Sequence, residues 1–127
     1  CGKVGCLEAI SSALAISKNY KEKSGKDLTS AEIVVAAKNG DVIAEHVWNE
    51  AIHYIGVGIE MLITTLAPEV IVFGGGVSQA GVDLLAPLEK YLDERLTFQR
   101  RPKLRIAHFG SAAGTIGCAL IAFDKVK

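Results

Sequence analysis

Several features are scarce in this 127-residue chain, and their scarcity limits the classes of protein that fit it. Lys and Arg number 14, as do Asp and Glu, so no field of one sign draws the chain to nucleic acid or to a membrane surface. Only three cysteines occur, without a disulfide framework, which fits a cytoplasmic protein. The most apolar stretch, residues 51–67, is interrupted by His53 and Glu60, so we expect a buried helix there and no membrane span. The sequence contains no internal repeat and no low-complexity segment.

Apolar residues, in contrast, are abundant. They make up 50% of the chain, which is high for an ordinary soluble domain and indicates surface that another segment or subunit covers. The chain has no initial methionine and begins inside a motif, so we expect it to be part of a longer protein. Residues 1–127 are predicted to form one domain-sized piece.

The first half of the chain is expected to be helical. Apolar periodicity predicts a helix from Leu7 to Lys18, followed by a charged surface connection from Lys21 to Lys26. Thr29 and Glu32 form a capping-box pattern at the start of a short helix that ends near Lys38. Asp41 is suited to cap a longer, largely apolar helix that ends near Leu66, and two glycines within that helix permit close packing: Gly56 and Gly58.

The second half of the chain is expected to alternate strands and helices. Residues 69–73 form a continuous apolar run, typical of a strand that is covered on both faces. The next helix contains Pro87, which is expected to kink or restart it. Cys118 is predicted to be a core residue of an apolar final helix. The elements expected after the first strand are a helix over residues 80–95, a strand over 103–108 and the final helix from 110 to about 123.

The first eight residues carry a local signal for metal or ligand binding. Cys1 and Cys6 enclose four residues and each adjoins a glycine, which permits a backbone path that wraps two thiolates around zinc. Tetrahedral zinc takes four ligands, so the pair alone also fits reduced thiols in a loop. Glu8 follows closely, and its carboxylate is suited either to accept hydrogen bonds from sugar hydroxyls or to occupy a first helical turn.

A second signal follows the strand predicted at residues 69–73. The chain continues as Gly74-Gly75-Gly76-Val77-Ser78, and glycines at this place let the backbone approach a nucleotide without a Cβ clash. The segment lacks the Lys-Ser/Thr pair of a phosphate loop and the full spacing of a dinucleotide fingerprint. Tight packing of the strand against a helix is the alternative explanation.

In this order, the two signals resemble the C-terminal half of the ROK family (repressor, open reading frame, kinase), which contains bacterial ATP-dependent sugar kinases and sugar-responsive repressors. The family pattern Cys-x-Cys-Gly-x-x-Gly-Cys-x-Glu, preceded by a histidine ligand, matches this chain from its second cysteine onward. The resemblance implies that Cys1 and Cys6 are two of the three cysteine ligands of a structural zinc ion. It also implies that Glu8 holds the sugar.

The resemblance extends to the glycines and to the final segment. It implies that four residues contact the adenosine part of ATP: Gly74, Gly75, Gly76 and Val77. The segment from Gly110 to Gly117 resembles the family's Gly-Asn/Asp-Asp-Ala-Gly-x-x-Gly, except that Ala112 replaces an acidic residue. For this segment we favour a packing role, in which small residues let helices approach closely.

The fold that the resemblance implies is an α/β, ribonuclease-H-like (actin-like ATPase) fold, of which residues 1–127 form most of the C-terminal lobe, rich in helices with few strands. The first hypothesis is a glucokinase-like kinase that transfers a phosphoryl group from ATP, with Mg, to a hexose hydroxyl. The family's aspartate base and phosphate loop would lie upstream of Cys1, so this fragment alone is expected to be inactive. A homodimer is also expected.

Two other functions remain open at this stage. The second hypothesis is the sugar-sensing lobe of a ROK repressor, and DNA is a partner only in that case. The intact glycines at residues 74–76 favour the kinase, whereas Ala112 favours the repressor. The third is a dimerisation lobe that binds no ligand by itself.

Overall fold

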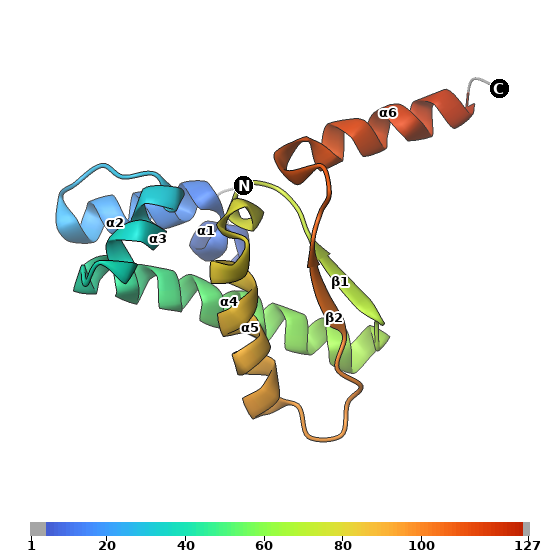
Figure 1. Ribbon diagram of the computed structural model, residues 1–127, viewed down its shortest axis with the longest axis horizontal. Coiled ribbons are helices and arrows are strands. Elements are labelled where there is room, and N and C mark those ends of the chain that lie inside the picture. The colour runs from blue at the N-terminus through green and yellow to red at the C-terminus, as the bar shows by residue number, and fades with distance from the viewer. Residues whose placement is uncertain (1–4, 126–127) are drawn as a thin grey trace.

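The computed structural model describes residues 5–125, apart from the side chain of Ser111, and shows a helix-rich α/β arrangement (Figure 1). In chain order the elements are α1 (Glu8–Ser11), α2 (Ala13–Ser24), α3 (Ser30–Lys38), α4 (Val42–Leu66), β1 (Val70–Phe73), the 3-10 helix η1 (Val77–Ala80), α5 (Val82–Arg95), β2 (Lys103–Ile106), the 3-10 helix η2 (Gly110–Ala112) and α6 (Ala113–Lys125).

The long helix α4 is the element on which the others assemble (Figure 1). Its start is fixed by Asp41, whose carboxylate accepts hydrogen bonds from the backbone N–H groups of Ile43 and Ala44, both at 3.0 Å. The helices α1, α2, α3 and α5 all pack against it. The predicted bounds of α4 and the capping box at Thr29 are therefore confirmed.

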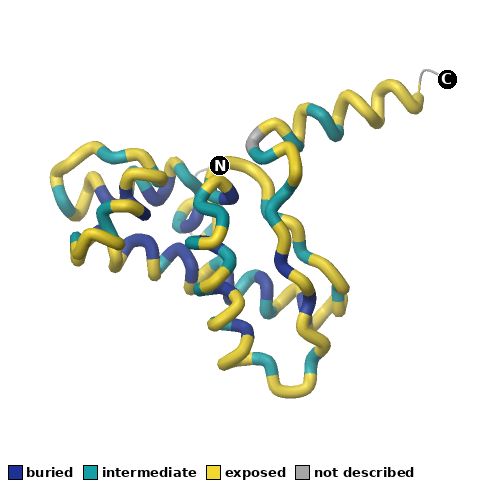
Figure 2. The backbone as a smooth tube through the Cα atoms, in the orientation of Figure 1, coloured by how far each residue is buried: buried dark blue, intermediate teal, exposed yellow. Residues whose placement is uncertain are grey.

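The hydrophobic core lies between α4 and the helices packed on it (Figure 2). It is continuous from α2 through α5 and includes one residue of the sheet, Leu104. Each fully buried aliphatic side chain stabilises the fold by about 1.5–3 kcal/mol. The large apolar side chains that are essentially inaccessible come from five elements: Ile16, Tyr20, Ile33, Val47, Ile63, Leu84, Leu88, Leu92 and Leu104.

The strands β1 and β2 pair in parallel, with Val70 opposite Lys103 and Phe73 opposite Ile106. The helix α5 connects them, as a parallel pair requires. One prediction is wrong here, because β1 is not covered on both faces. Alternate side chains of β1 are exposed, with Val72 at 59%, since no element among residues 5–125 covers that face.

The N-terminal helices differ from the prediction in two respects. The helix expected from Leu7 onward is broken at Ser12, whose extended backbone and side-chain oxygen cap α2 through a hydrogen bond from Ala15 N–H at 3.1 Å. The helix α2 then continues beyond Lys18 to Ser24, where Gly25 ends it with a φ of +72°. The first part of the expected surface connection is therefore helical. Lys21 and Lys23 lie in the last turn of α2, where positive charge interacts favourably with the helix dipole.

The C-terminal helices also bear on the predictions. The helix α5 contains Pro87 and does not restart there. The helix α6 extends away from the rest of the described chain and has no buried residue (Figures 1 and 2). Cys118 lies on α6 and is exposed, so its predicted place in the core is wrong. Within residues 5–125, none of the helices combines the length and the apolarity that crossing a membrane would need.

Candidate functional site

The turn that precedes α1 is shaped by Gly5 and Cys6. Gly5 has a φ of +83°, a left-handed conformation that glycine adopts without a Cβ penalty. Cys6 is half-buried, and its carbonyl oxygen accepts a hydrogen bond from Ala9 N–H at 3.0 Å. Cys1 lies outside the described residues. Within residues 5–125 no three His, Cys, Asp or Glu side chains are grouped closely enough to hold a metal ion.

Glu8 is the first residue of α1, and it is exposed. Two contacts anchor this short helix on α4. The buried Ser11 hydroxyl donates a hydrogen bond to the Ala51 carbonyl at 3.2 Å, and Leu7 lies so close to Gly58 that an added Cβ would be 3.2 Å from the leucine side chain. Close packing permitted by Gly58, as predicted, therefore determines where Glu8 lies.

The three glycines after β1 have different surroundings. Gly75 has a φ of +85°, so any other residue would be strained there. A Cβ on Gly76 would lie only 3.0 Å from the Cβ of Ala13, the first residue of α2. A Cβ on Gly74 would meet its nearest neighbours at 3.8 Å, an ordinary contact. Backbone conformation and close packing thus account for glycine at positions 75 and 76, but not at position 74.

The glycine loop is tied to the core by a buried serine. Ser78 is 2% exposed, and its hydroxyl donates a hydrogen bond to the Gly75 carbonyl at 2.7 Å. A buried side chain of the protein therefore holds the loop in place. Nothing in the sequence indicated that Ser78 has this role.

A hollow of about 380 Å³ lies where α1 and the start of α2 face the glycine loop. We call it the Glu8 hollow. Its polar side chains are a carboxylate and two hydroxyls, and its other wall is loop backbone with apolar side chains. The lining residues are Leu7, Glu8, Ser11, Ser12, Ala13, Ile55, Gly74, Gly76 and Val77.

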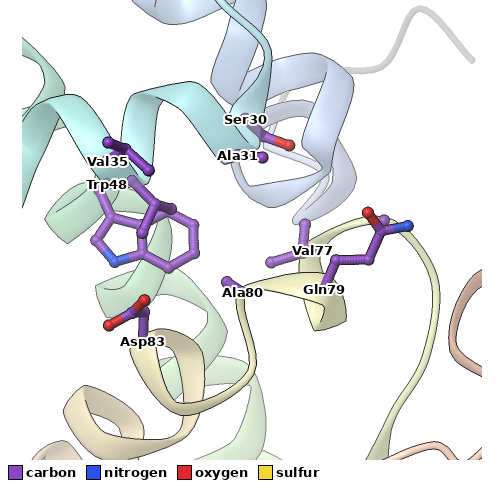
Figure 3. A pocket seen from close by; sticks show the side chains of 10 residues that line it. Ser30, Ala31, Val35, Trp48, Val77, Gln79, Ala80 and Asp83 are labelled. Atoms are coloured by element: carbon purple, nitrogen blue, oxygen red, sulfur yellow. The ribbon is translucent and has the colours of Figure 1, made fainter.

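A second hollow, of about 230 Å³, lies on the other side of the loop between α3, α4 and η1 (Figure 3). We call it the Trp48 hollow. Its walls are mostly apolar, and an ion pair between Lys38 and Asp83 links α3 to α5 nearby, with 2.8 Å between nitrogen and oxygen. The lining residues are Ser30, Ala31, Val34, Val35, Trp48, Gly76, Val77, Gln79, Ala80 and Asp83.

A third hollow of about 500 Å³ between α4 and β1 is lined almost wholly by apolar side chains and by no charged residue. Ser78 is the one polar side chain among its lining residues, so it offers chiefly packing surface. The Glu8 hollow and the Trp48 hollow, which share Gly76 and Val77 as a common wall, are therefore the candidate site.

The structure brings most of the predicted site residues together. Glu8, which was predicted to hold a sugar, lines the same hollow as Gly74, Gly76 and Val77, which were predicted to contact a nucleotide. Gly75 and Cys6 line neither hollow. The other polar side chains that line the two hollows were not identified from the sequence: Ser11, Ser12, Ser30, Gln79 and Asp83. Of these, only Ser12 carried a recognisable signal, as a helix-capping residue type.

The segment that begins at Gly110 lies beside the glycine loop, because η2 contacts η1. Ala113 is close to Gly74, with 3.9 Å between its Cβ and the position of an added glycine Cβ. Farther along α6, an added Cβ at Gly114 or Gly117 would have no neighbour within 4 Å among the described residues. The predicted packing role therefore holds at Ala113 and is wrong at these two glycines, and Ala112 itself is exposed.

Comparison with known proteins gives consistent matches. The sequence pattern of the ROK family matches residues 1–125. A glucokinase from Halalkalibacterium halodurans is 37% identical, with an alignment that covers 92% of this chain and 40% of the relative. The chain thus spans about two fifths of the length of that relative.

Solved structures agree with the sequence match. A ROK hexokinase from Thermus thermophilus has a TM-score of 0.76 and 31% identity, over 99% of this chain and 43% of that one. A ROK glucokinase from Streptomyces griseus, solved in complex with glucose and AMPPNP, has a TM-score of 0.78 and 25% identity, over 95% and 45%. A ROK transcriptional regulator, a homolog of the E. coli MLC protein, has a TM-score of 0.70 and 28% identity, over 95% and 34%.

Proposed function

The chain belongs to the ROK family, and we propose that it is the C-terminal lobe of an ATP-dependent sugar kinase with a ribonuclease-H-like, actin-like ATPase fold. One observation carries this proposal. The Glu8 hollow is lined both by the residue proposed to hold a sugar and by the glycine loop proposed to contact ATP. Phosphoryl transfer requires the sugar hydroxyl and the terminal phosphate to meet, so the two binding elements of a kinase must share a cavity.

The two hollows suggest how the nucleotide lies. The mostly apolar walls of the Trp48 hollow suit the faces of an adenine ring. The wall at Gly76 separates this hollow from the one that contains Glu8. In the proposed arrangement the base occupies the Trp48 hollow, the ribose passes the glycine loop, and the phosphates point toward the Glu8 hollow.

Glu8 is proposed to orient the sugar and not to remove its proton. The carboxylate at the start of α1 accepts hydrogen bonds from sugar hydroxyls, and Ser11 and Ser12 add hydroxyl groups to the same wall. The catalytic base, the phosphate loop and the groups that hold Mg are proposed to belong to the other lobe. This chain alone is therefore proposed to be inactive.

A structural zinc ion is part of the proposal, with Cys1 and Cys6 as two of its ligands. The position of Cys6 supports this, because Cys6 follows the left-handed Gly5 and lies two residues before Glu8. Zinc would supply four-coordinate rigidity at that turn. Cys6 would then hold the start of α1, so that Glu8 keeps its direction. A cytoplasmic homodimer is also proposed, with a hexose and ATP as its ligands.

The role of Glu8 is tested with Glu8→Gln in the full-length protein. Loss of a charge-assisted hydrogen bond to the sugar is expected to raise the KM for glucose by about 10- to 100-fold. Glu22→Gln is the matched control, because Glu22 lies on the exposed surface of α2 in an ion pair with Lys18. Normal glucose kinetics in Glu8→Gln would refute the role.

The role of the glycine loop is better tested at Gly74 than at Gly75. A substitution such as Gly75→Val is expected to weaken ATP binding, but the φ of +85° at Gly75 would also strain the loop. Gly74 has room for a Cβ, so Gly74→Ala should leave the melting temperature unchanged. We expect it to weaken AMPPNP binding in calorimetry, by placing a methyl group where nucleotide approaches the backbone. An unchanged affinity would remove Gly74 from the nucleotide site.

A second function, that of a transcriptional repressor, is also proposed because one similar solved structure supports it. The match to a ROK transcriptional regulator and the exposed Ala112, where the family has an acidic residue, favour a sugar-sensing lobe of a repressor. The full-length protein decides between the two. A kinase forms a phosphorylated sugar from ATP, whereas a repressor binds duplex DNA in a manner that sugar alters and forms no such product.

A further inference from the structure

Ser78 is one of two buried polar residues in the described part of the chain, and the proposed function gives it no task. Its hydroxyl donates to the Gly75 carbonyl at 2.7 Å, so this carbonyl is directed toward the interior. The bond joins a buried side chain to the exposed loop that forms the wall between the two hollows. This hydrogen bond can therefore influence the loop surface that faces the two hollows.

The direction of the Gly75 carbonyl fixes the direction of the next amide. In a trans peptide the C=O and N–H vectors are antiparallel, and residues 5–125 contain no cis peptide. The N–H of Gly76 therefore points away from the Ser78 hydroxyl. Within the described residues this N–H has no acceptor, and Gly76 lines both hollows.

This peptide needs a restraint because glycine stands on both of its sides. A flip of the peptide changes ψ of Gly75 and φ of Gly76, and neither residue has a Cβ to oppose the rotation. The loop backbone alone therefore selects one orientation only weakly. The Ser78 hydroxyl selects the orientation in which the Gly76 N–H is presented to a ligand.

We infer that Ser78 is a positioning residue, which aims the Gly76 N–H at a phosphate oxygen of the bound nucleotide. The inference rests on the proposed function, since it assigns the donor that receives the phosphate chain as it passes from the Trp48 hollow to the Glu8 hollow. Backbone N–H groups at glycine-rich turns suit this task because they donate without bringing a side chain close.

The test uses the full-length protein and three probes in calorimetry: AMPPNP, adenosine and glucose. Ser78→Ala removes the hydroxyl and is expected to weaken AMPPNP binding about tenfold, the loss expected for a hydrogen bond to a charged oxygen. Adenosine has no phosphate, so its affinity should not change, and neither should that of glucose. Ser78→Thr keeps the hydroxyl and should restore AMPPNP binding.

A matched control comes from a hydroxyl elsewhere. Tyr91→Phe removes a partly buried hydroxyl that donates to Glu60 at 3.2 Å, on helices that carry neither the glycine loop nor Glu8. It is expected to leave AMPPNP affinity unchanged. A second readout needs no ligand, because the Gly76 amide resonance in NMR spectra should broaden or split in Ser78→Ala if the peptide gains a second orientation.

The outcomes separate the inference from the proposed function. If the unsubstituted protein binds no AMPPNP, the proposed function fails, and the inference fails with it. If it does bind, unchanged AMPPNP affinity or a Gly76 amide resonance that stays single and sharp in Ser78→Ala overturns the inference alone. Equal losses for AMPPNP and adenosine would show that Ser78 shapes the base site, and a parallel loss of glucose binding would show a purely structural role. Each of these results contradicts the phosphate assignment.

Discussion

The helices α4 and α6 are both rich in apolar residues, yet they differ completely in burial. Eight residues of α4 are buried, from Ala44 to Ile63, whereas α6 has none among its described residues. Its large side chains remain in solvent, including Leu120 at 60% exposure and Phe123 at 72%. The contrast is visible along the chain in Figure 2.

The difference shows that the burial of a helix depends on the elements that pack against it, and that its apolar composition alone does not bury it. Four helices pack against α4, whereas α6 contacts chiefly the short η2 that precedes it. The apolar residues of α4 therefore stabilise this chain by themselves. Those of α6 contribute stability only when something covers them.

The largest effect is expected from truncating one leucine in each region. Leu88 on α5 is fully buried in the core around α4, so Leu88→Ala should lower the free energy of unfolding by about 2–5 kcal/mol. Leu120 on α6 is exposed, so Leu120→Ala should change it by less than about 0.5 kcal/mol. Urea denaturation of this chain measures both. Similar losses for the two variants would mean that α6 is packed in solution.

A smaller effect is expected from adding one methyl group to a glycine in each helix. A Cβ on Gly56 of α4 would lie 2.7 Å from the Tyr91 ring, so Gly56→Ala should cost about 1–3 kcal/mol through overpacking. Gly117 of α6 has open space around it, so Gly117→Ala should gain up to about 1 kcal/mol from helix propensity. Thermal unfolding shows whether each substitution lowers or raises the melting temperature. A destabilising Gly117→Ala would place a neighbour against α6.

The same contrast explains what the sequence could and could not predict. The start of α4 was predictable because Asp41 acts locally on the first turn, and the role of Gly58 followed from helix propensity and packing. The exposure of Cys118 was not predictable, since an apolar helix has the same sequence pattern whether or not its partner belongs to the chain.

The site shows a similar division. Glu8 and the glycine loop were found from short motifs, but their common cavity arises from contacts between α1, α2 and the loop that are distant in sequence. The hydrogen bond from Ser78 to Gly75 spans only three residues, yet a serine after glycines has many possible partners. Tertiary packing selected this one by burying the hydroxyl.

The smallest effect is expected at the start of α4, where the stability of the buried helix depends on pH through Asp41. The backbone N–H of Ala44, followed by the Tyr20 hydroxyl at 2.7 Å, lowers the pKa of Asp41 in the folded chain. A carboxyl with a lowered folded-state pKa stabilises the fold above its unfolded pKa of about 3.9, and this stability is lost as pH falls through the folded value. Hydrogen bonds from the Thr29 side chain and backbone also lower the pKa of Glu32 at the start of α3, so the acid response should arise at the first turns of α3 and α4.

The substitutions Asp41→Asn and Tyr20→Phe dissect that response. Asp41→Asn is expected to lower the unfolding midpoint in urea at pH 7. The difference from the unsubstituted chain shrinks below about pH 4 and disappears once pH has fallen through the lowered folded-state pKa of Asp41, because both side chains are then uncharged. Tyr20→Phe removes one of the hydrogen bonds that lower the Asp41 pKa and leaves those from the backbone, so its acid response should be weaker but retained. A constant difference for Asp41→Asn from pH 7 to pH 2 would show that the Asp41 charge does not stabilise α4. The buried region would then owe its stability to apolar packing alone.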